Sequence, residues 1–375
     1  MYLRIEKQMV KLSDFALNDS ILCALGYQLR RSARLTIAQT SDTVCIHAVT
    51  DDADRRLDLK GMIYDNDSLV APGCRVPLDE KPEGVTPTFV TIARDGVLYR
   101  FYWYNEKWQI STTGCINPDV TWGAGTKATF NDLIADAKSQ WDSEQLDKRY
   151  CYYAVLEHPN FINIVKHQQL SLTLIYMINT ETLEEISPCQ LDIDKGFKNH
   201  EQVHLRPRAE HPNAVADPRP LTVDDVGHCF YYADGTVYKE STELYKAAVV
   251  AKPNLPDPAQ QYIMLIKDPA LYRAHLEFFP WNAQLFGWLN HLMYMLQSTI
   301  VADFRANVHA TVRACHPRHT SYMRDLLAHY KGKTPTDEEI VAHFLSQDRP
   351  RIFYMLNPHG HAAPAAAAAT VSVVV

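Results

Sequence analysis

The sequence predicts an α+β fold, in which a core of antiparallel strands is followed by a helical C-terminal domain. Between about residues 55 and 266, short runs of β-branched and aromatic residues alternate with turn signals, a pattern typical of strands. After Pro280, apolar residues recur at helical spacing. At 375 residues the chain is too long for one small core, so we expect two domains or one large domain with an appendage.

The first predicted strands lie in residues 61–70 and 97–104, which are rich in β-branched and aromatic side chains. In residues 99–112, polar and apolar side chains interleave around Asn105 and Glu106. This pattern predicts a hairpin whose inner face packs on a core and whose outer face is solvated.

One helix is predicted to interrupt the strands, at residues 130–143. Either Thr129 or Asn131 can cap its first turn, because both side chains accept hydrogen bonds from free backbone amides. A second strand pair is predicted at residues 151–156 and 170–178.

The remaining elements are a loop, three helices and a tail. Residues 205–221 contain four prolines among charged residues, which predicts a long exposed loop. Helical periodicity covers residues 282–314 and 319–330, and residues 334–345 begin with a capping sequence that predicts a third helix. Residues 359–375 are alanine-rich, of low complexity, and expected to be mobile. No internal repeat is visible.

We therefore predict four parts in the chain. They are an N-terminal extension at residues 1–50, a strand-rich domain at 51–280, a helical C-terminal domain at 281–358 and a flexible tail at 359–375.

Composition and charge narrow the class of protein. The net charge of -7 argues against a protein that coats nucleic acid non-specifically, although a local basic surface is compatible with it. The eight cysteines are scattered singly without a CxxC pair, which favours an intracellular, reducing compartment over a disulfide or zinc framework. We expect no signal peptide and no membrane helix, because no stretch approaches the roughly 20 apolar residues that a span requires.

The most informative segment is residues 94–112, which follow Ala93 and begin with Arg94, Asp95 and Gly96. It resembles the nucleotide-binding hairpin of covalent nucleotidyltransferases, the superfamily of ATP-dependent RNA and DNA ligases and capping guanylyltransferases. In that superfamily a Lys-x-Asp-Gly tetrad carries the lysine that attacks the α-phosphate of the nucleotide. Ala93 stands in the place of this lysine, and a methyl group cannot form a phosphoramidate.

Further segments resemble, in the same order, those of RNA-ligase-like proteins found in large DNA viruses, distant relatives of phage-type ATP-dependent RNA ligases. The matching segments are residues 59–65, 95–112, 151–165, 235–245 and 254–265. The resemblance covers about residues 59–357. It implies a nucleotidyltransferase core with a helical C-terminal domain, and a viral source.

The chain departs from the family pattern at three further positions. The third family motif supplies a carboxylate where this chain has Val155, and the fourth opens with a glutamate where Val226 precedes Gly227. The fifth supplies two lysines on one strand face, whereas Lys239 is followed by Ser241. Adenylyl transfer needs a reactive amine, a divalent ion held by carboxylates, and cations for the phosphate. The resemblance with these departures therefore implies an inactive member of the superfamily.

Candidate site residues follow from the resemblance. Those that would contact a nucleotide or phosphate are Lys60, Asp95, Gly96, Arg100 and Lys239. No catalytic or metal-binding residue is predicted, and ATP and Mg²⁺ are expected only if the protein is active. The alternatives are that Asp95 and Gly96 form a simple turn, and that Arg100 and Lys239 are solvated. Lys60 and Lys107 are the plausible substitute nucleophiles nearby.

The helical domain offers a second candidate surface. Its local excess of basic residues would suit an RNA backbone, and the candidates are Arg305, Arg313, Arg318 and Arg324. A solvated helix surface is the alternative. Residues 315–319 invite a zinc interpretation, but their spacing matches no common site and a plain helix connector fits better.

Aromatic residues gather on the predicted hairpin and could stack on bases, although alternate strand residues point to opposite faces and at least half should be core. They are Tyr99, Phe101, Tyr102, Trp103, Tyr104 and Trp108.

Three functions remain open from the sequence. The first is a degenerate RNA-ligase-like protein that binds RNA or a nucleotide without covalent chemistry. The second is an active ATP-dependent RNA ligase with a relocated lysine, and the third is a structural or virion-associated protein that uses the fold as a scaffold. If the source is viral, host cytoplasm, virus factory or virion are the expected locations.

Overall fold

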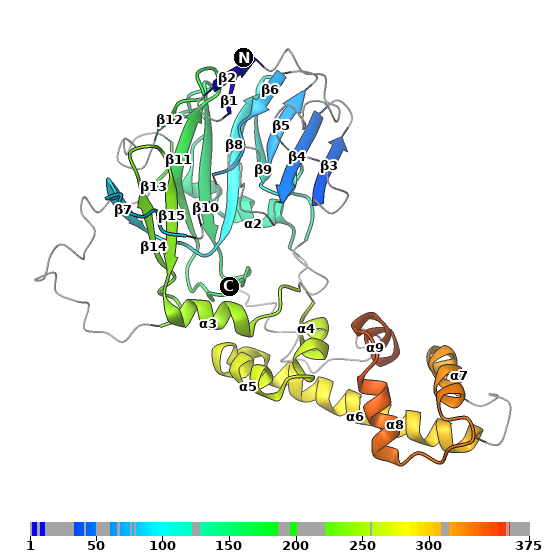
Figure 1. The fold of residues 1–375 in the computed structure, drawn as a ribbon. Helices are drawn as coiled ribbons and strands as arrows, with labels where there is room; N and C mark the ends of the chain where they lie inside the picture. The colour runs from blue at the N-terminus through cyan, green and yellow to red at the C-terminus, as the bar shows by residue number, and fades with distance from the viewer. Residues whose placement is uncertain are drawn as a thin grey trace, which may run out of the picture. The chain divides into compact units, whose positions relative to one another are not determined.

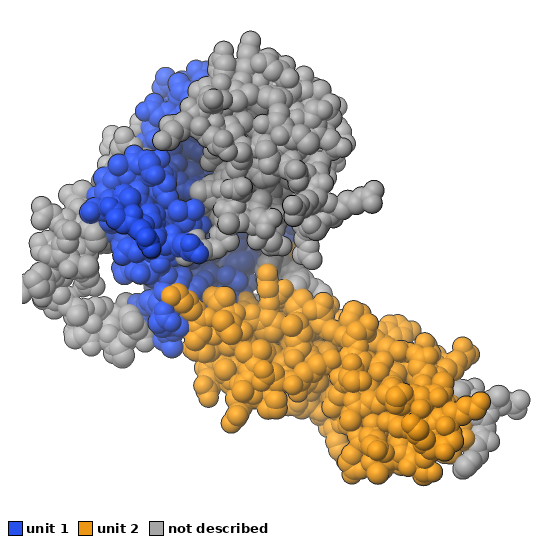
Figure 2. Space-filling model, in the orientation of Figure 1, with its two compact units in different colours: residues 1–120, 128–245 blue, residues 121–127, 246–375 orange. Residues whose placement is uncertain are grey.

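The computed structural model describes residues 2–5, 8–11, 34–40, 43–49, 61–65, 68–75, 77–78, 80–121, 128–186, 196–200, 222–255, 257–308, 315–357 and 360. The chain forms two compact units (Figure 2). One consists of Met1–Val120 with Ala128–Tyr245, and the other of Thr121–Lys127 with Lys246–Val375. The predicted four-part division of the chain stays a prediction.

The first unit contains the strands (Figure 1). They are β1 (Tyr2–Ile5), β2 (Gln8–Lys11), β3 (Arg34–Thr40), β4 (Thr43–Val49), β5 (Met62–Asp65), β6 (Ser68–Ala71), β7 (Phe89–Ile92), β8 (Val97–Tyr104), β9 (Lys107–Thr112), β10 (Tyr150–Glu157), β11 (Ser171–Asn179), β12 (Glu185–Ile186), β13 (Asn199–His200), β14 (Gly227–Tyr231) and β15 (Val237–Ser241). All the described strand pairs are antiparallel except β11 with β13. The predicted α+β class with an antiparallel core is confirmed.

These strands form separate sheets. The largest has the order β12-β11-β10-β8-β9, with β13 added beside β11. A second has the order β15-β14-β7, a third the order β3-β4-β5-β6, and β1 pairs with β2. Strands β3 and β4, inside the predicted N-terminal extension, thus join a sheet with the first predicted strands of the core.

The predicted hairpin is confirmed as β8 and β9. Asn105 and Glu106 both have positive φ, 49° and 59°. Two consecutive left-handed residues give the tight turn whose twist matches that of the flanking strands.

The prediction that the outer face of this hairpin is solvated is wrong. On one face of β8, Tyr99 and Phe101 are fully buried in a core with α2 (Phe130–Asp136). On the other face, Tyr102 belongs to a second core that includes Ile63 of β5. The large sheet is covered on both sides, because a neighbouring sheet contributes apolar residues that sequence periodicity cannot reveal.

The predicted interrupting helix is shorter than expected. It consists of α2 followed by a 3₁₀ turn at Lys138–Gln140. Thr129 is the cap: its hydroxyl accepts from the Asp132 amide, and the Asp132 carboxylate accepts from the Thr129 amide. This reciprocal pair satisfies two amides that would otherwise lack partners.

The helical region begins earlier in the chain than the sequence predicted, and it contains the remaining described α-helices. They are α3 (Glu243–Ala251), α4 (Pro258–Leu265), α5 (Pro269–Phe278), α6 (Ala283–Asn307), α7 (Thr320–His329), α8 (Asp337–Leu345) and α9 (Arg349–Leu356). The extension of strand alternation to residue 266 is therefore wrong. Asp257 and Asp268 each precede a proline and cap α4 and α5. An Asp-Pro pair is a helix start signal, but short apolar runs nearby favoured the prediction of strands.

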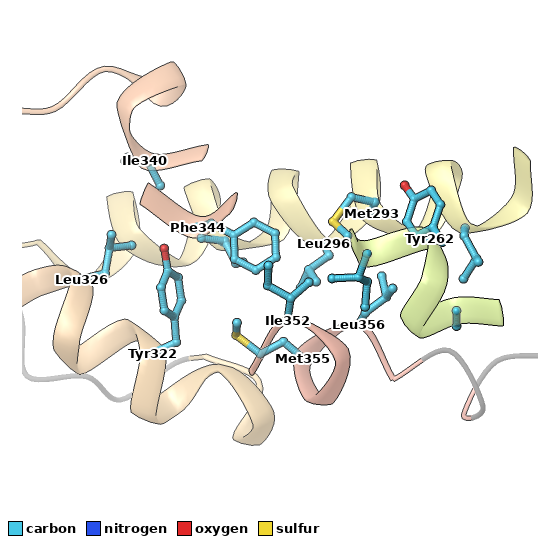
Figure 3. Packing of buried hydrophobic residues seen from close by; sticks show 14 of the residues in the cluster. Tyr262, Met293, Leu296, Tyr322, Leu326, Ile340, Phe344, Ile352, Met355 and Leu356 are labelled. Carbon is cyan, nitrogen blue, oxygen red and sulfur yellow. The ribbon is translucent and has the colours of Figure 1, made fainter. Parts of the chain in front are cut away.

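The helical unit has its own apolar core (Figure 3). Phe344 of α8 lies among Leu296 of α6, Tyr322 of α7 and Ile352 of α9, and all four are nearly or fully buried. The predicted cap of α8 is confirmed, since Thr336 and Glu339 form a reciprocal capping box. The predicted helical C-terminal region is thus confirmed.

Two predicted segments lie outside the described residues: the proline-rich loop at residues 205–221, and the alanine-rich tail at 359–375 apart from residue 360. In the part of the chain that the structure describes, no helix is long and apolar enough to cross a membrane.

Candidate functional site

The Ala93–Gly96 segment connects two different sheets. Strand β7, before it, pairs with β14, whereas β8, after it, pairs with β9 and β10. The interpretation of Asp95 and Gly96 as a simple hairpin turn is therefore wrong, because the flanking strands do not pair with each other. We call this crossing, residues 93–96, the sheet junction.

Asp95 collects hydrogen bonds at the sheet junction. Its carboxylate accepts from the backbone amides of Ile164 and Val165 at 2.8 and 2.7 Å and from the side-chain amide of Asn163 at 2.7 Å. The Tyr245 hydroxyl donates a fourth bond at 3.2 Å. Asp95 is only 4% exposed, so these donors replace the water that a carboxylate otherwise requires.

Tyr245 links this carboxylate to a cation. The Lys239 ammonium lies 5.4 Å from the centre of the Tyr245 ring. Burial and the nearby Asp95 carboxylate raise the pKa of Tyr245 above its ordinary value, so the hydroxyl stays a donor at neutral pH. The predicted candidates Asp95, Gly96 and Lys239 are thus brought together, by strands far apart in the sequence.

A histidine and a salt bridge also lie at the sheet junction. The His167 imidazole is within hydrogen-bonding distance of the Asp95 carbonyl. Arg94 forms a salt bridge with Glu157 of β10 at 3.1 Å, and both side chains are largely buried. Glu157 lies two residues after Val155, on the same face of the strand.

Close backbone approach explains two glycines. A Cβ on Gly96 would lie 2.4 Å from the Leu156 carbonyl oxygen and 2.8 Å from Val155. A Cβ on Gly227 would lie 2.0 Å from the Glu240 carbonyl oxygen, and its φ is +137°. Only glycine fits at either position without displacing a strand.

Ala93 itself is buried at the junction. It is 3% exposed, and its amide donates to the Gly227 carbonyl at 2.9 Å. Val226 is 4% exposed and Val155 is half-buried. These three residues therefore present apolar side chains.

Arg100 lies on the outer face of the hairpin, and this face is covered rather than solvated. It is fully buried and donates to the carbonyls of Gly61 and Pro72 and to the Ser111 hydroxyl. Burial raises the pKa of the adjacent Cys151 thiol to about 12, so this thiol is neutral. The solvated alternative for Arg100 is wrong, and these bonds account for its charge without a ligand. Its assignment as a phosphate ligand stays a prediction.

The substitute nucleophiles are separated from the junction or undescribed. Lys60 lies outside the described residues. Lys107 is opposite Tyr104, at the far end of β8 from Val97. Seven residues at roughly 3.3 Å each put it about 23 Å away. Lys107 is therefore too distant to replace a nucleophile at Ala93.

Two of the four candidate RNA contacts have partners within the helical unit. Arg305 forms a salt bridge with Asp337 at 2.6 Å, and Arg318 donates to the Tyr354 carbonyl at 3.2 Å. Arg324 is exposed on α7, and Arg313 lies outside the described residues. Their role in RNA binding stays a prediction.

The segment around Cys315 and His319 forms a helix connector. His316 caps the 3₁₀ turn Pro317–His319, and His319 lies 3.5 Å from Asp303. Within the described residues, no group of three or more His, Cys, Asp or Glu side chains is arranged to hold a metal ion. The described cysteines, at positions 74, 115, 151, 229 and 315, are free.

Several residues of the site were missed in the sequence. They are Arg94, Glu157, Asn163, His167 and Tyr245. The polar residues after β10 were a usable signal, since Asn163 and His167 flank an apolar pair in a loop. Their partner Asp95 lies about 70 residues earlier, a pairing that no local pattern encodes.

Comparison of the sequence with known protein families gives no match, and comparison with curated proteins gives none either. Among solved structures, the chain is similar to a putative ATP-dependent DNA ligase from Aquifex aeolicus, with a TM-score of 0.40, 13% identity, and coverage of 79% of this chain and 85% of that chain. It is also similar to a Naegleria gruberi RNA ligase mutant with AMP and Mn, with a TM-score of 0.30, 15% identity, and coverage of 65% and 74%. A second mutant of that ligase, with ATP and Mn, gives a TM-score of 0.29 at 13% identity, covering 65% and 75%. These TM-scores are too low to establish a shared fold, so the α+β assignment rests on the strands and helices themselves.

Proposed function

We propose that this chain is a catalytically inactive, RNA-ligase-like protein that binds a nucleotide or RNA at the sheet junction. One observation carries the proposal. Ala93, at the position of the nucleophilic lysine, is buried, and the polar groups beside it are engaged within the protein.

The loss of chemistry follows from what surrounds Ala93. A nucleophile must present an unprotonated amine to the α-phosphate, and a divalent ion must be held by free carboxylates. Asp95 receives four hydrogen bonds and Glu157 is paired with Arg94. Neither carboxylate is free to hold a metal ion unless these contacts break.

The binding half of the proposal rests on Lys239. It is half-buried beside Tyr245, and within the described residues its ammonium has no carboxylate partner. A cation in this setting can still meet a phosphate group. We place the nucleotide phosphates at this side chain.

The second candidate is an active ligase with a relocated lysine. Its nucleophile would be Lys239 rather than Lys107, because Lys239 lies at the sheet junction. The inactive and the active candidate are distinguished by incubating the protein with α-labelled ATP or GTP and Mg²⁺ or Mn²⁺, followed by denaturing electrophoresis. We expect no covalent label. Label that disappears in Lys239→Ala would overturn the proposal and identify the nucleophile.

Binding is measured by equilibrium dialysis with labelled ATP and by titration with RNA at two salt concentrations. We expect Lys239→Glu to weaken binding, and Lys81→Glu, an exposed lysine of the same unit, to leave it unchanged. Protein that is folded but binds neither ATP nor RNA would contradict the binding role and favour a scaffold.

A further inference from the structure

The outer end of the β8–β9 hairpin carries a row of aromatic side chains. Trp103 of β8 is directly opposite Trp108 of β9. On the other side of β8, Phe101 is opposite Tyr152 of β10, so Tyr150, two residues earlier on the same face, extends the row next to Trp103. We call Tyr150, Trp103 and Trp108 the aromatic row.

The aromatic row differs in exposure from its inner neighbours. Phe101 and Tyr152, one step inward, are fully buried, whereas the three members of the row are half-buried. The Trp103 and Trp108 rings meet edge to face at 5.6 Å, and Trp108 lies 5.9 Å from Tyr152. The core therefore holds the rings from one side and leaves part of their surface accessible.

A lysine lies on the aromatic row. The Lys148 ammonium is 3.9 Å from the centre of the Trp103 ring, whereas Lys107, opposite Tyr104, points to the other face of the hairpin. Arg149 lies over Tyr150 at 5.9 Å but is paired with Asp147, and Glu181 is a second acidic group close to it. Within the described residues, Lys148 has no carboxylate partner.

We propose that the aromatic row with Lys148 binds a single-stranded nucleic acid, the rings stacking on bases and the ammonium group meeting a phosphate. Unpaired bases offer flat faces to aromatic side chains, and cations beside the rings follow the phosphate backbone. A duplex hides its base faces, so it would not use the rings. The inference deepens the proposed function and rests on it for the class of ligand.

This surface is separate from the sheet junction. Trp103 is six residues from Val97 along β8, which at roughly 3.3 Å per residue is about 20 Å. A strand on the aromatic row and a nucleotide at Lys239 therefore occupy different ends of β8. Their binding can be measured independently.

The test uses the full-length protein and labelled oligo(U) or oligo(dT) of about 20 nucleotides. Binding is followed by anisotropy, and stacking by quenching of tryptophan fluorescence, at about 50 and about 200 mM salt. We expect both oligonucleotides to bind and quench at low salt. Trp281→Phe, in the helical unit, should leave the quenching unchanged, whereas Trp103→Phe should reduce it.

Two variants remove the proposed contacts. We expect Trp103→Ala to weaken binding about tenfold or more, the usual loss for one stacked base. Because that change could disturb the core, Lys148→Glu provides a surface variant, which should also flatten the salt dependence. The matched control, Lys198→Glu, makes the same change of charge at an exposed lysine elsewhere on the unit.

Four outcomes would overturn the inference: no oligonucleotide binding at low salt, equal binding of a duplex, equal weakening by the control variant, or no weakening by either site variant. Each is distinguishable from failure of the proposed function, because ATP binding that depends on Lys239 is measured separately. A result in which ATP binds and oligonucleotides do not would reject only the aromatic row.

Discussion

Replacing Asp95 by alanine tests whether the sheet junction depends on its carboxylate. The change leaves four donors without an acceptor: the amides of Ile164 and Val165, the Asn163 side chain and the Tyr245 hydroxyl. Each buried donor left unpaired costs about 1–3 kcal/mol. Water can enter the space and satisfy some of them, so we expect a loss of about 3–5 kcal/mol in the free energy of unfolding of this unit.

Asp95→Asn keeps the volume and removes the charge. The amide oxygen of the new side chain can accept only some of the four hydrogen bonds, and its NH₂ group faces other donors. We therefore expect a loss of about 2–3 kcal/mol in the free energy of unfolding. Asp119, which is exposed in the same unit, provides the control, and Asp119→Asn should stay within about 0.5 kcal/mol of the natural protein.

The chain has two compact units, so a single unfolding transition is not expected. Urea denaturation is therefore combined with hydrogen exchange of the peptide that contains residues 163–165. Loss of protection at the Ile164 and Val165 amides should accompany the loss of stability. Unchanged protection there, or an Asp95→Ala variant within about 0.5 kcal/mol of the natural protein, would refute the reasoning.

Three further outcomes are expected. Gly227→Ala should destabilise the first unit by more than about 3 kcal/mol in urea, because its Cβ would meet the Glu240 carbonyl oxygen at 2.0 Å; a smaller loss would show that β14 can shift. Arg100→Lys should cost about 3 kcal/mol by the same measurement, since one ammonium group cannot replace three separate guanidinium contacts, and a neutral result would contradict their importance. Burial lowers the pKa of His275, whose ring bonds the Ala251 carbonyl and the Asn282 amide, so the unfolded chain binds the proton more readily. The thermal midpoint of the helical unit should therefore fall as the pH decreases below about 6.5, and His275→Gln should reduce that dependence.

Local signals in the sequence predicted local structure well. Thr129 and Thr336 cap the helices that follow them, and Asn105 with Glu106 forms the hairpin turn. Each of these features involves groups within four residues of one another. The conformational preference of the chain is enough to specify them.

The same reasoning failed where burial depends on distant segments. Arg100 occupies a strand position that alternation assigned to solvent, and the packing of a second sheet places it in the core. The start of the helical unit was missed because the Asp-Pro caps of α4 and α5 follow apolar runs that resemble strands.

By itself, the sequence determined the α+β class, the hairpin, several helix caps and the absence of a lysine at Ala93. Only the tertiary structure decided that Asp95 lies between two sheets and bonds Tyr245, 150 residues away. It likewise decided that Tyr150, Trp103 and Trp108 form one row across three strands. The physical reason is that strand pairing joins segments far apart in the chain, and residue spacing along one strand carries no record of its neighbours.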